Sequence, residues 1–144
     1  MDLQETINNK LKVDRTEKMK TSKQLTLGEL ILLFENLPDK DDGVRFDFGY
    51  FCPTDLSSWR GSYSELAFGY NETDKDDPTV GEILQHMKSM LGTTLQGYKG
   101  GDFVMGETTP VWVSNYGKAN CTAVVGVTQL NWGKVIIDTK YIDY

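Results

Sequence analysis

The sequence predicts an α+β fold in a single domain, with two or three helices packed on a mostly antiparallel sheet that ends in a C-terminal meander. Two Thr-x-Gly-Glu segments, at residues 26–29 and 79–82, each precede apolar residues at helical spacing. Short runs of alternating polar and apolar residues lie between the two segments and dominate the chain after residue 93. Helices followed by runs of strands are typical of α+β proteins.

The composition is that of a globular domain. The chain has 144 residues, 39% hydrophobic and 25% charged, which allows one domain with a sizeable core. No apolar run approaches the roughly 20 residues that cross a bilayer, and the first nine residues do not resemble a secretory signal. We therefore expect an intracellular protein with no membrane partner. Its two separated cysteines, Cys52 and Cys121, are expected to be reduced thiols.

The net charge of −6 excludes one class of partner. Proteins that bind long DNA or RNA need a basic surface to displace counterions, and this chain has 21 acidic residues against 15 basic ones. A small anionic ligand needs only two or three local cations, so the charge is compatible with such a ligand.

The first 24 residues are expected to form an extension, helical or partly flexible, ahead of an α+β domain at residues 25–144. Leu3, Ile7 and Leu11 fall at helical spacing, which predicts a short amphipathic helix. The sequence leaves open whether this segment docks on a partner subunit or frays.

Both predicted helices begin at a capping box. The Thr26 hydroxyl is expected to accept the N–H of Glu29, whose carboxylate returns the bond, and Pro38 ends the helix soon after. The same arrangement at Thr79 predicts a helix that stops at Gly92.

The strands are predicted from alternation and turn residues. Residues 51–64 contain proline, serine and glycine beside Trp59 and Arg60, so we expect a loop there. Gly126 predicts a bulge within its strand, and Trp132 at a turn tip indicates a contact between copies of the chain. The expected strands are residues 44–50, 66–70, 94–98, 102–105, 109–115, 122–130 and 134–141.

Motifs of catalysis are absent from the sequence. It has no Gly-x-Ser-x-Gly, Walker loop, Rossmann fingerprint or Cys-x-x-Cys, and its single histidine, His86, has no evident partner. The acidic loops at 39–42 and 74–77 lack the alternating ligands of a calcium loop and are interpreted as solvated turns. We therefore expect a protein that is not an enzyme, with no cofactor and no metal.

The most distinctive stretch is Gly97–Met105. Tyr98 and Lys99 precede the glycine pair Gly100 and Gly101, whose backbone N–H groups could cradle an anion beside the lysine charge. A hairpin turn between two strands explains the same residues.

Further candidate binding residues lie in two other segments. Arg60 is a natural phosphate ligand, and Gly61 beside it permits close approach, although a salt bridge to Glu65 is an equal alternative. Asn115 could contact a base edge or could cap a turn. The candidate stacking faces are Tyr63, Tyr98, Trp112 and Tyr116, each of which could instead pack in the core or on the sheet.

Four motifs in one order resemble a family of small proteins of tailed bacteriophages. They are Arg60-Gly61-x-Tyr63-x-Glu65-Leu66-Ala67, Thr79-Val80-Gly81-Glu82-x-Leu84, Gly97-Tyr98-Lys99-Gly100-Gly101-x-Phe103-x-Met105 and Thr109-Pro110-Val111-Trp112-Val113-x-Asn115-Tyr116-Gly117. The resemblance covers roughly residues 25–125. In size and in its Arg, Lys, aromatic and Gly residues, the chain is also similar to the anti-Thoeris and anti-CBASS sponges, which sequester nucleotide immune signals in pockets at oligomer interfaces.

The resemblance implies a homo-oligomeric counter-defence protein that binds a small phosphorylated nucleotide, cyclic or ADP-ribose-like, without catalysis. Arg60 and Lys99 would hold phosphates with the amides of Gly100 and Gly101. Tyr63, Tyr98 or Tyr116 would stack the base, and Asn115 would contact its edge. The alternatives are a protein-binding inhibitor of a host defence enzyme, a nucleotide hydrolase, and a structural protein without a ligand.

Overall fold

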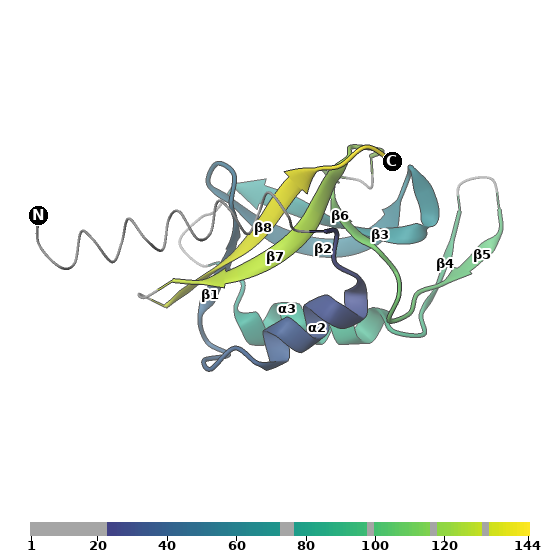
Figure 1. Ribbon diagram of the computed structural model, residues 1–144. Helices are drawn as coiled ribbons and strands as arrows, with labels where there is room; N and C mark the ends of the chain where they lie inside the picture. The colour runs from purple at the N-terminus through teal and green to yellow at the C-terminus, as the bar shows by residue number, and fades with distance from the viewer. Residues whose placement is uncertain (1–22, 73–76, 98–99, 116–117, 131–132) are drawn as a thin grey trace, which may run out of the picture.

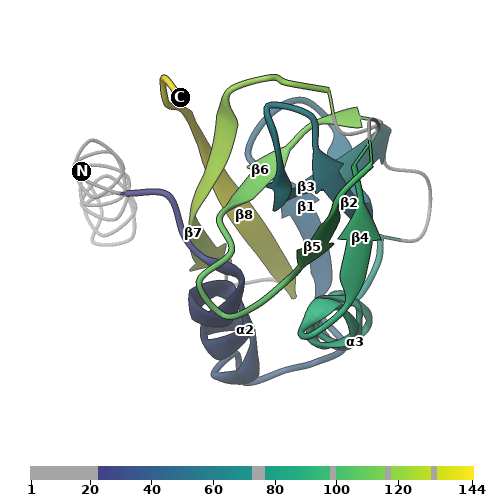
Figure 2. The ribbon, with the colours of Figure 1, turned by 90° about the vertical axis from the view of Figure 1, so that its right-hand side faces the viewer.

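Two helices and a strongly curved six-stranded sheet make up most of the part of the chain that the structure describes (Figures 1 and 2). The structure is a computed structural model, and it describes residues 23–72, 77–97, 100–115, 118–130 and 133–144. The helices are α2 (Leu27–Glu35) and α3 (Val80–Met90), which lie side by side against one face of the sheet. The predicted α+β class agrees with this arrangement.

The sheet is mixed and barrel-like rather than flat and antiparallel. Its order is β1-β8-β7-β6-β3-β2, with parallel pairing between β1 and β8 and between β3 and β6, and antiparallel pairing elsewhere. The strands are β1 (Gly43–Phe46), β2 (Phe51–Trp59), β3 (Ser62–Glu72), β6 (Val111–Val113), β7 (Thr122–Gln129) and β8 (Lys134–Tyr141).

The expected C-terminal meander is present only in part. Strands β6, β7 and β8 follow one another antiparallel in the main sheet, and the bulge predicted at Gly126 is confirmed by a register shift there. Within the part of the chain that the structure describes, strands β4 (Thr94–Gln96) and β5 (Asp102–Val104) instead pair only with each other. They form a separate hairpin that projects at one end of the sheet (Figure 1).

The loop predicted at residues 51–64 is wrong for most of its length. Phe51–Trp59 forms β2, which pairs with β3 and lies at the edge of the sheet. Pro53 is tolerated because an edge strand does not need every N–H for the ladder. A register shift between Pro53 and Leu56 keeps the rest of the strand paired.

The helix starts are confirmed at both capping boxes. Thr26 N–H donates to Glu29 Oε1 at 3.1 Å, and Glu29 N–H donates to Thr26 Oγ1 at 3.3 Å. Thr79 and Glu82 repeat the same pair of bonds at α3. Within the described residues, no helix is long and apolar enough to cross a membrane.

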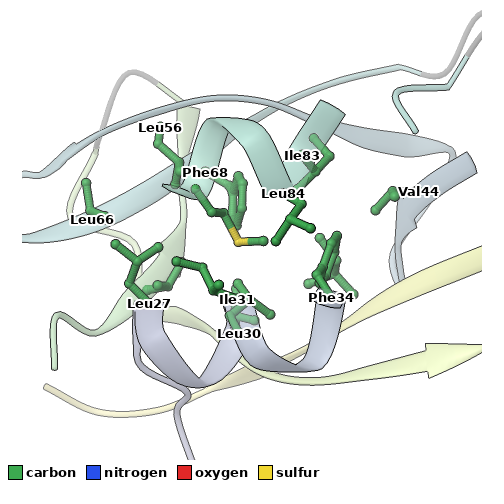
Figure 3. Close-up of a cluster of buried hydrophobic side chains, with 14 of the residues drawn as sticks. Leu27, Leu30, Ile31, Phe34, Val44, Leu56, Leu66, Phe68, Ile83 and Leu84 are labelled. Atoms are coloured by element: carbon green, nitrogen blue, oxygen red, sulfur yellow. The ribbon is translucent and has the colours of Figure 1, made fainter. Parts of the chain in front are cut away.

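The main hydrophobic core fills the space between the helices and the inner face of the sheet (Figure 3). Residues at helical spacing on α2 face this core, and alternate residues of β3 meet them from the sheet. The largest contributors are Leu27, Leu30, Phe34, Leu66, Phe68 and Met87, all of which are buried.

A second, smaller core covers the opposite face of the sheet. Trp59 on β2 and Trp112 on β6 stack with ring centroids 4.0 Å apart and an interplanar angle of 10°. They meet across β3, which lies between β2 and β6, because Ala67 of β3 packs in the same cluster and is small. The indole of Trp59 also lies over Gly61, where an added Cβ would be 2.2 Å from a ring carbon.

The packing around Gly61 gives a stability prediction. Replacing Gly61 with Ala should lower the free energy of unfolding by about 1–3 kcal/mol, because the new methyl group must displace the Trp59 ring from its stack. Urea denaturation followed by tryptophan fluorescence measures this loss.

The matched control is Gly106→Ala, since a Cβ at Gly106 meets no atom within 4 Å. The control should change stability by less than about 1 kcal/mol. Equal losses in the two variants would contradict the proposed role of Gly61.

Candidate functional site

The turn between β2 and β3 and the β4–β5 hairpin meet at one end of the molecule. The ring of Tyr63, at the start of β3, lies nearly parallel to that of Phe103 on β5, with centroids 6.4 Å apart and an interplanar angle of 23°. Tyr63 and Phe103 are both half-buried. The structure therefore brings together two of the segments that the sequence analysis placed in one site, although they are about forty residues apart in the chain.

Gly97 lies beside both rings. A Cβ at this position would lie 3.1 Å from Phe103 Cε2 and 3.4 Å from Tyr63 Cγ. The two rings therefore pack directly against the Gly97 backbone, and a side chain there would crowd them. A Cβ would also lie 2.9 Å from the Gly100 carbonyl oxygen, so the same glycine is needed for the turn of the hairpin.

The glycine pair forms the hairpin turn that the sequence predicted. Gly100 and Gly101 have φ angles of +93° and +87°, which favour glycine. Gly100 N–H donates to the Gly97 carbonyl at 3.1 Å, and Gly97 N–H donates to the Gly101 carbonyl at 3.1 Å. The Gly100 amide therefore has a partner inside the hairpin. Any anion cradle would depend chiefly on Gly101.

Arg60 extends from the turn between β2 and β3, next to the buried Trp59, and is exposed. Among the described residues it forms no ion pair, so the salt bridge to Glu65 is not formed. Glu65 Oε1 instead accepts a hydrogen bond from Trp112 Nε1 at 2.9 Å. The Arg60 guanidinium is left accessible for an anion, three residues before Tyr63.

Asn115 lies at the other end of β3. Its Oδ1 accepts the Tyr70 N–H at 2.8 Å, which ties the end of β6 to β3. Tyr70 is seven residues after Tyr63, a distance of roughly 20 Å along a strand. The base-edge contact predicted for Asn115 therefore cannot be made by a mononucleotide that is stacked on Tyr63.

The other predicted ligand residues divide into two groups. Trp112 is only 1% exposed because its ring is stacked on Trp59, so it has no face for a ligand. Tyr98, Lys99 and Tyr116 lie outside the described residues, and their roles stay predictions.

Phe103 is the residue that sequence analysis did not assign to the site. The sequence did contain a signal for this role. Phe103 lies two residues after Gly101 in a short predicted strand, where alternate side chains face the same way. Its neighbours Asp102 and Val104 are exposed, while Phe103 turns toward Tyr63 and the core.

A buried carboxylate elsewhere joins β1, β8 and the start of α3. Asp77 Oδ2 accepts from Arg45 Nε at 2.7 Å and from Lys134 Nζ at 2.8 Å. Burial raises the pKa of Asp77, but the hydrogen bonds and charges of Lys134 and Arg45 outweigh it and hold the pKa below its ordinary value. This network pairs two cations with one buried carboxylate and ties β1, β8 and the segment before α3 together.

Both cysteines are thiols, as expected. Burial, followed by the negative charge of Asp77, raises the pKa of the Cys52 thiol above its ordinary value. The thiol is therefore protonated at neutral pH, and Cys52 is a poor nucleophile.

A shallow hollow lies elsewhere, on the outer side of α3, and is lined by Glu82, Gln85, His86 and Ser89. This lining includes no lysine or arginine, and its single ring is the His86 imidazole. Among the described residues, no three His, Cys, Asp or Glu side chains are grouped closely enough to hold a metal ion. No family model, curated protein or solved structure matches the chain.

The Asp77 network gives a pH prediction. Because its folded pKa is lowered, Asp77 stabilises the fold above the unfolded pKa of about 3.9, and this contribution is lost as the pH falls through the folded pKa. Asp77→Asn should therefore cost about 2 kcal/mol at pH 7, the scale of a charge-assisted hydrogen bond, and progressively less below pH 4. Urea unfolding at pH 7 and pH 3 measures both values.

Asp102→Asn is the control, since Asp102 is exposed on the hairpin and should show little effect at either pH. A cost for Asp77→Asn that does not diminish in acid would contradict the assignment.

Proposed function

We propose that this protein binds a small phosphorylated nucleotide at the junction of the β2–β3 turn and the β4–β5 hairpin, and does not turn it over. In this proposal it is a phage counter-defence protein that sequesters a nucleotide immune signal in the host cytoplasm. The counter-defence role comes from the resemblance of its motifs to the phage family and of its size and residue types to the sponges. The binding role is supported by the arrangement of the residues themselves.

The observation that carries the proposal is the contact between Tyr63 and Phe103 beside an exposed arginine. A half-buried tyrosine held against a second ring is a rigid stacking face, and Arg60 three residues earlier presents its guanidinium to solvent. A base stacked on Tyr63 would direct its phosphates toward the turn. Lys99 and Gly101 would add contacts from the hairpin.

The size of these interactions is sufficient for a sequestering protein only if several act together. Stacking one base on an aromatic side chain contributes roughly 1–3 kcal/mol. Nanomolar binding requires about 12 kcal/mol, so phosphate contacts must supply much of the remainder. This is why the proposed ligand carries phosphate groups and is not a free base or nucleoside.

A second copy of the chain would complete the site. Val104, next to Phe103 on the hairpin, is apolar and 67% exposed, and the hairpin pairs with no other strand of the described residues. Burial of this side chain against another protomer would favour a homo-oligomer and would enclose the ligand. The non-catalytic part of the proposal rests on the sequence, which lacks the hydrolase motifs and has a single histidine.

Calorimetry with cyclic dinucleotides and ADP-ribose isomers tests the proposal. At least one compound should bind, and Arg60→Ala and Tyr63→Ala should each weaken it at least tenfold, because the first removes a phosphate contact and the second a stacking face. Lys118→Ala is the control, because Lys118 is an exposed cation outside the proposed site. It follows the end of β6, which Asn115 ties to the end of β3 opposite to Tyr63.

The alternatives give different results in the same experiment. Binding that Arg60→Ala and Tyr63→Ala leave intact would contradict the site. Recovery of a cleaved ligand after heat denaturation of the complex would indicate a hydrolase. Failure of every nucleotide to bind, together with tight binding of a host defence enzyme, would favour the protein-binding inhibitor.

A further inference from the structure

Aromatic rings gather where the turn after β1 meets the end of β3. The ring of Phe48 lies on that of Phe46, with centroids 5.2 Å apart and an interplanar angle of 11°. Phe51 and Tyr70 meet each other at 5.1 Å, and they meet Phe48 at 5.7 Å and 5.5 Å. Phe46 is buried, whereas the other three residues are only half-buried. The cluster therefore continues the main core out to the surface.

Tyr50 extends this cluster into solvent. It lies in the turn between β1 and β2, directly before Phe51, and is 78% exposed. Among the described residues, no other ring lies against it. The turn is closely packed, because Gly49 has a φ angle of +53° and a Cβ there would lie 2.8 Å from Phe51 Cδ2. A partner that contacts Tyr50 therefore meets a ring on a backbone that is already ordered, which lowers the entropy cost of binding.

A carboxylate without an ionic partner lies beside these rings. Phe51 pairs with Glu72 across β2 and β3. Glu72 is exposed and forms no ion pair with the residues that the structure describes. Arg45 of β1 does not neutralise it, because the Arg45 guanidinium is bonded to the buried Asp77. The patch therefore presents uncompensated negative charge, on a chain whose net charge is −6.

This combination of rings and a carboxylate selects the chemistry of a partner. The face of a tyrosine ring attracts a cation, more often arginine than lysine. The flat guanidinium of arginine can stack on a ring and bond to a carboxylate with two N–H groups. Tyrosine, phenylalanine and arginine are also enriched in protein–protein interfaces. A phosphate group would be repelled by Glu72.

The surface that we call the Tyr50 patch consists of Phe48, Tyr50, Phe51, Tyr70 and Glu72. We propose that this patch binds a partner protein through an arginine side chain on that protein's surface. The guanidinium lies over the Tyr50 ring and pairs with Glu72, and the atoms around it cover the half-buried rings. The patch lies at the opposite end of β3 from Tyr63, so its binding does not depend on the proposed nucleotide site.

A short labelled peptide of alternating arginine and glycine tests the proposal by fluorescence anisotropy. The reference is the same peptide with citrulline, an uncharged analogue of arginine with nearly the same shape. The arginine peptide should bind the whole protein with a Kd below about 1 mM, and the citrulline peptide should bind at least tenfold more weakly. Tyr50→Ala and Glu72→Gln should each weaken the arginine peptide about threefold or more, the scale of an exposed cation–π contact or ion pair. Both side chains are exposed, so these substitutions should leave the fold intact.

Tyr141→Ala and Asp102→Asn are the matched controls. Tyr141 is a 69% exposed tyrosine and Asp102 an exposed carboxylate, and both lie outside the patch. They should leave binding of the arginine peptide unchanged. Failure of that peptide to bind, equal binding of the citrulline peptide, or binding that Tyr50→Ala and Glu72→Gln leave intact would overturn the proposal. Dimerisation in analytical ultracentrifugation that Tyr50→Ala abolishes would also overturn it, because a second copy of the chain would then cover the patch.

Discussion

Burial of both faces of β3 is the constraint on which the rest of the structure depends. Leu66 and Phe68 face the main core, while Ala67 lies beneath the stacked Trp59 and Trp112 on the other side. A shift of one residue in the register would exchange these faces and place a phenylalanine where the tryptophans meet. The strand is therefore held in one register by packing on two sides, which hydrogen bonds alone would not ensure.

That fixed register also places the candidate nucleotide site. Tyr63 lies where β3 begins, beside the projecting hairpin. The proposed site needs this second segment, because Phe103 on β5 supplies the ring that lies against Tyr63. The site is therefore a consequence of how distant parts of the chain pack on the same strand.

Local features of the fold could be predicted from the sequence, and long-range ones could not. The capping boxes at Thr26 and Thr79 are complete within four residues, so their bonds follow from the sequence alone. The extended conformation of β2 was missed because Pro53 and the serines resemble a loop, and only pairing with β3 overrides them. The parallel pairs of the sheet and the Phe103 contact both depend on chain segments that no short pattern connects.

Gly61 shows why a motif can be recognised and its role still be misjudged. Because Gly61 follows Arg60, the sequence analysis interpreted it as a position that lets a ligand approach closely. The group that approaches it is instead the indole of Trp59, and a Cβ at Gly61 would lie 2.2 Å from the ring. Arg60 is therefore positioned by the second, smaller core, because it directly follows Trp59, whose ring is held in the stack with Trp112. A substitution at Gly61 would change stability and ligand affinity together, whereas Arg60 can be altered without disturbing the stack. The proposed phosphate contact of Arg60 and the tryptophan stack beside it are thus separable by experiment, although they are adjacent in the chain.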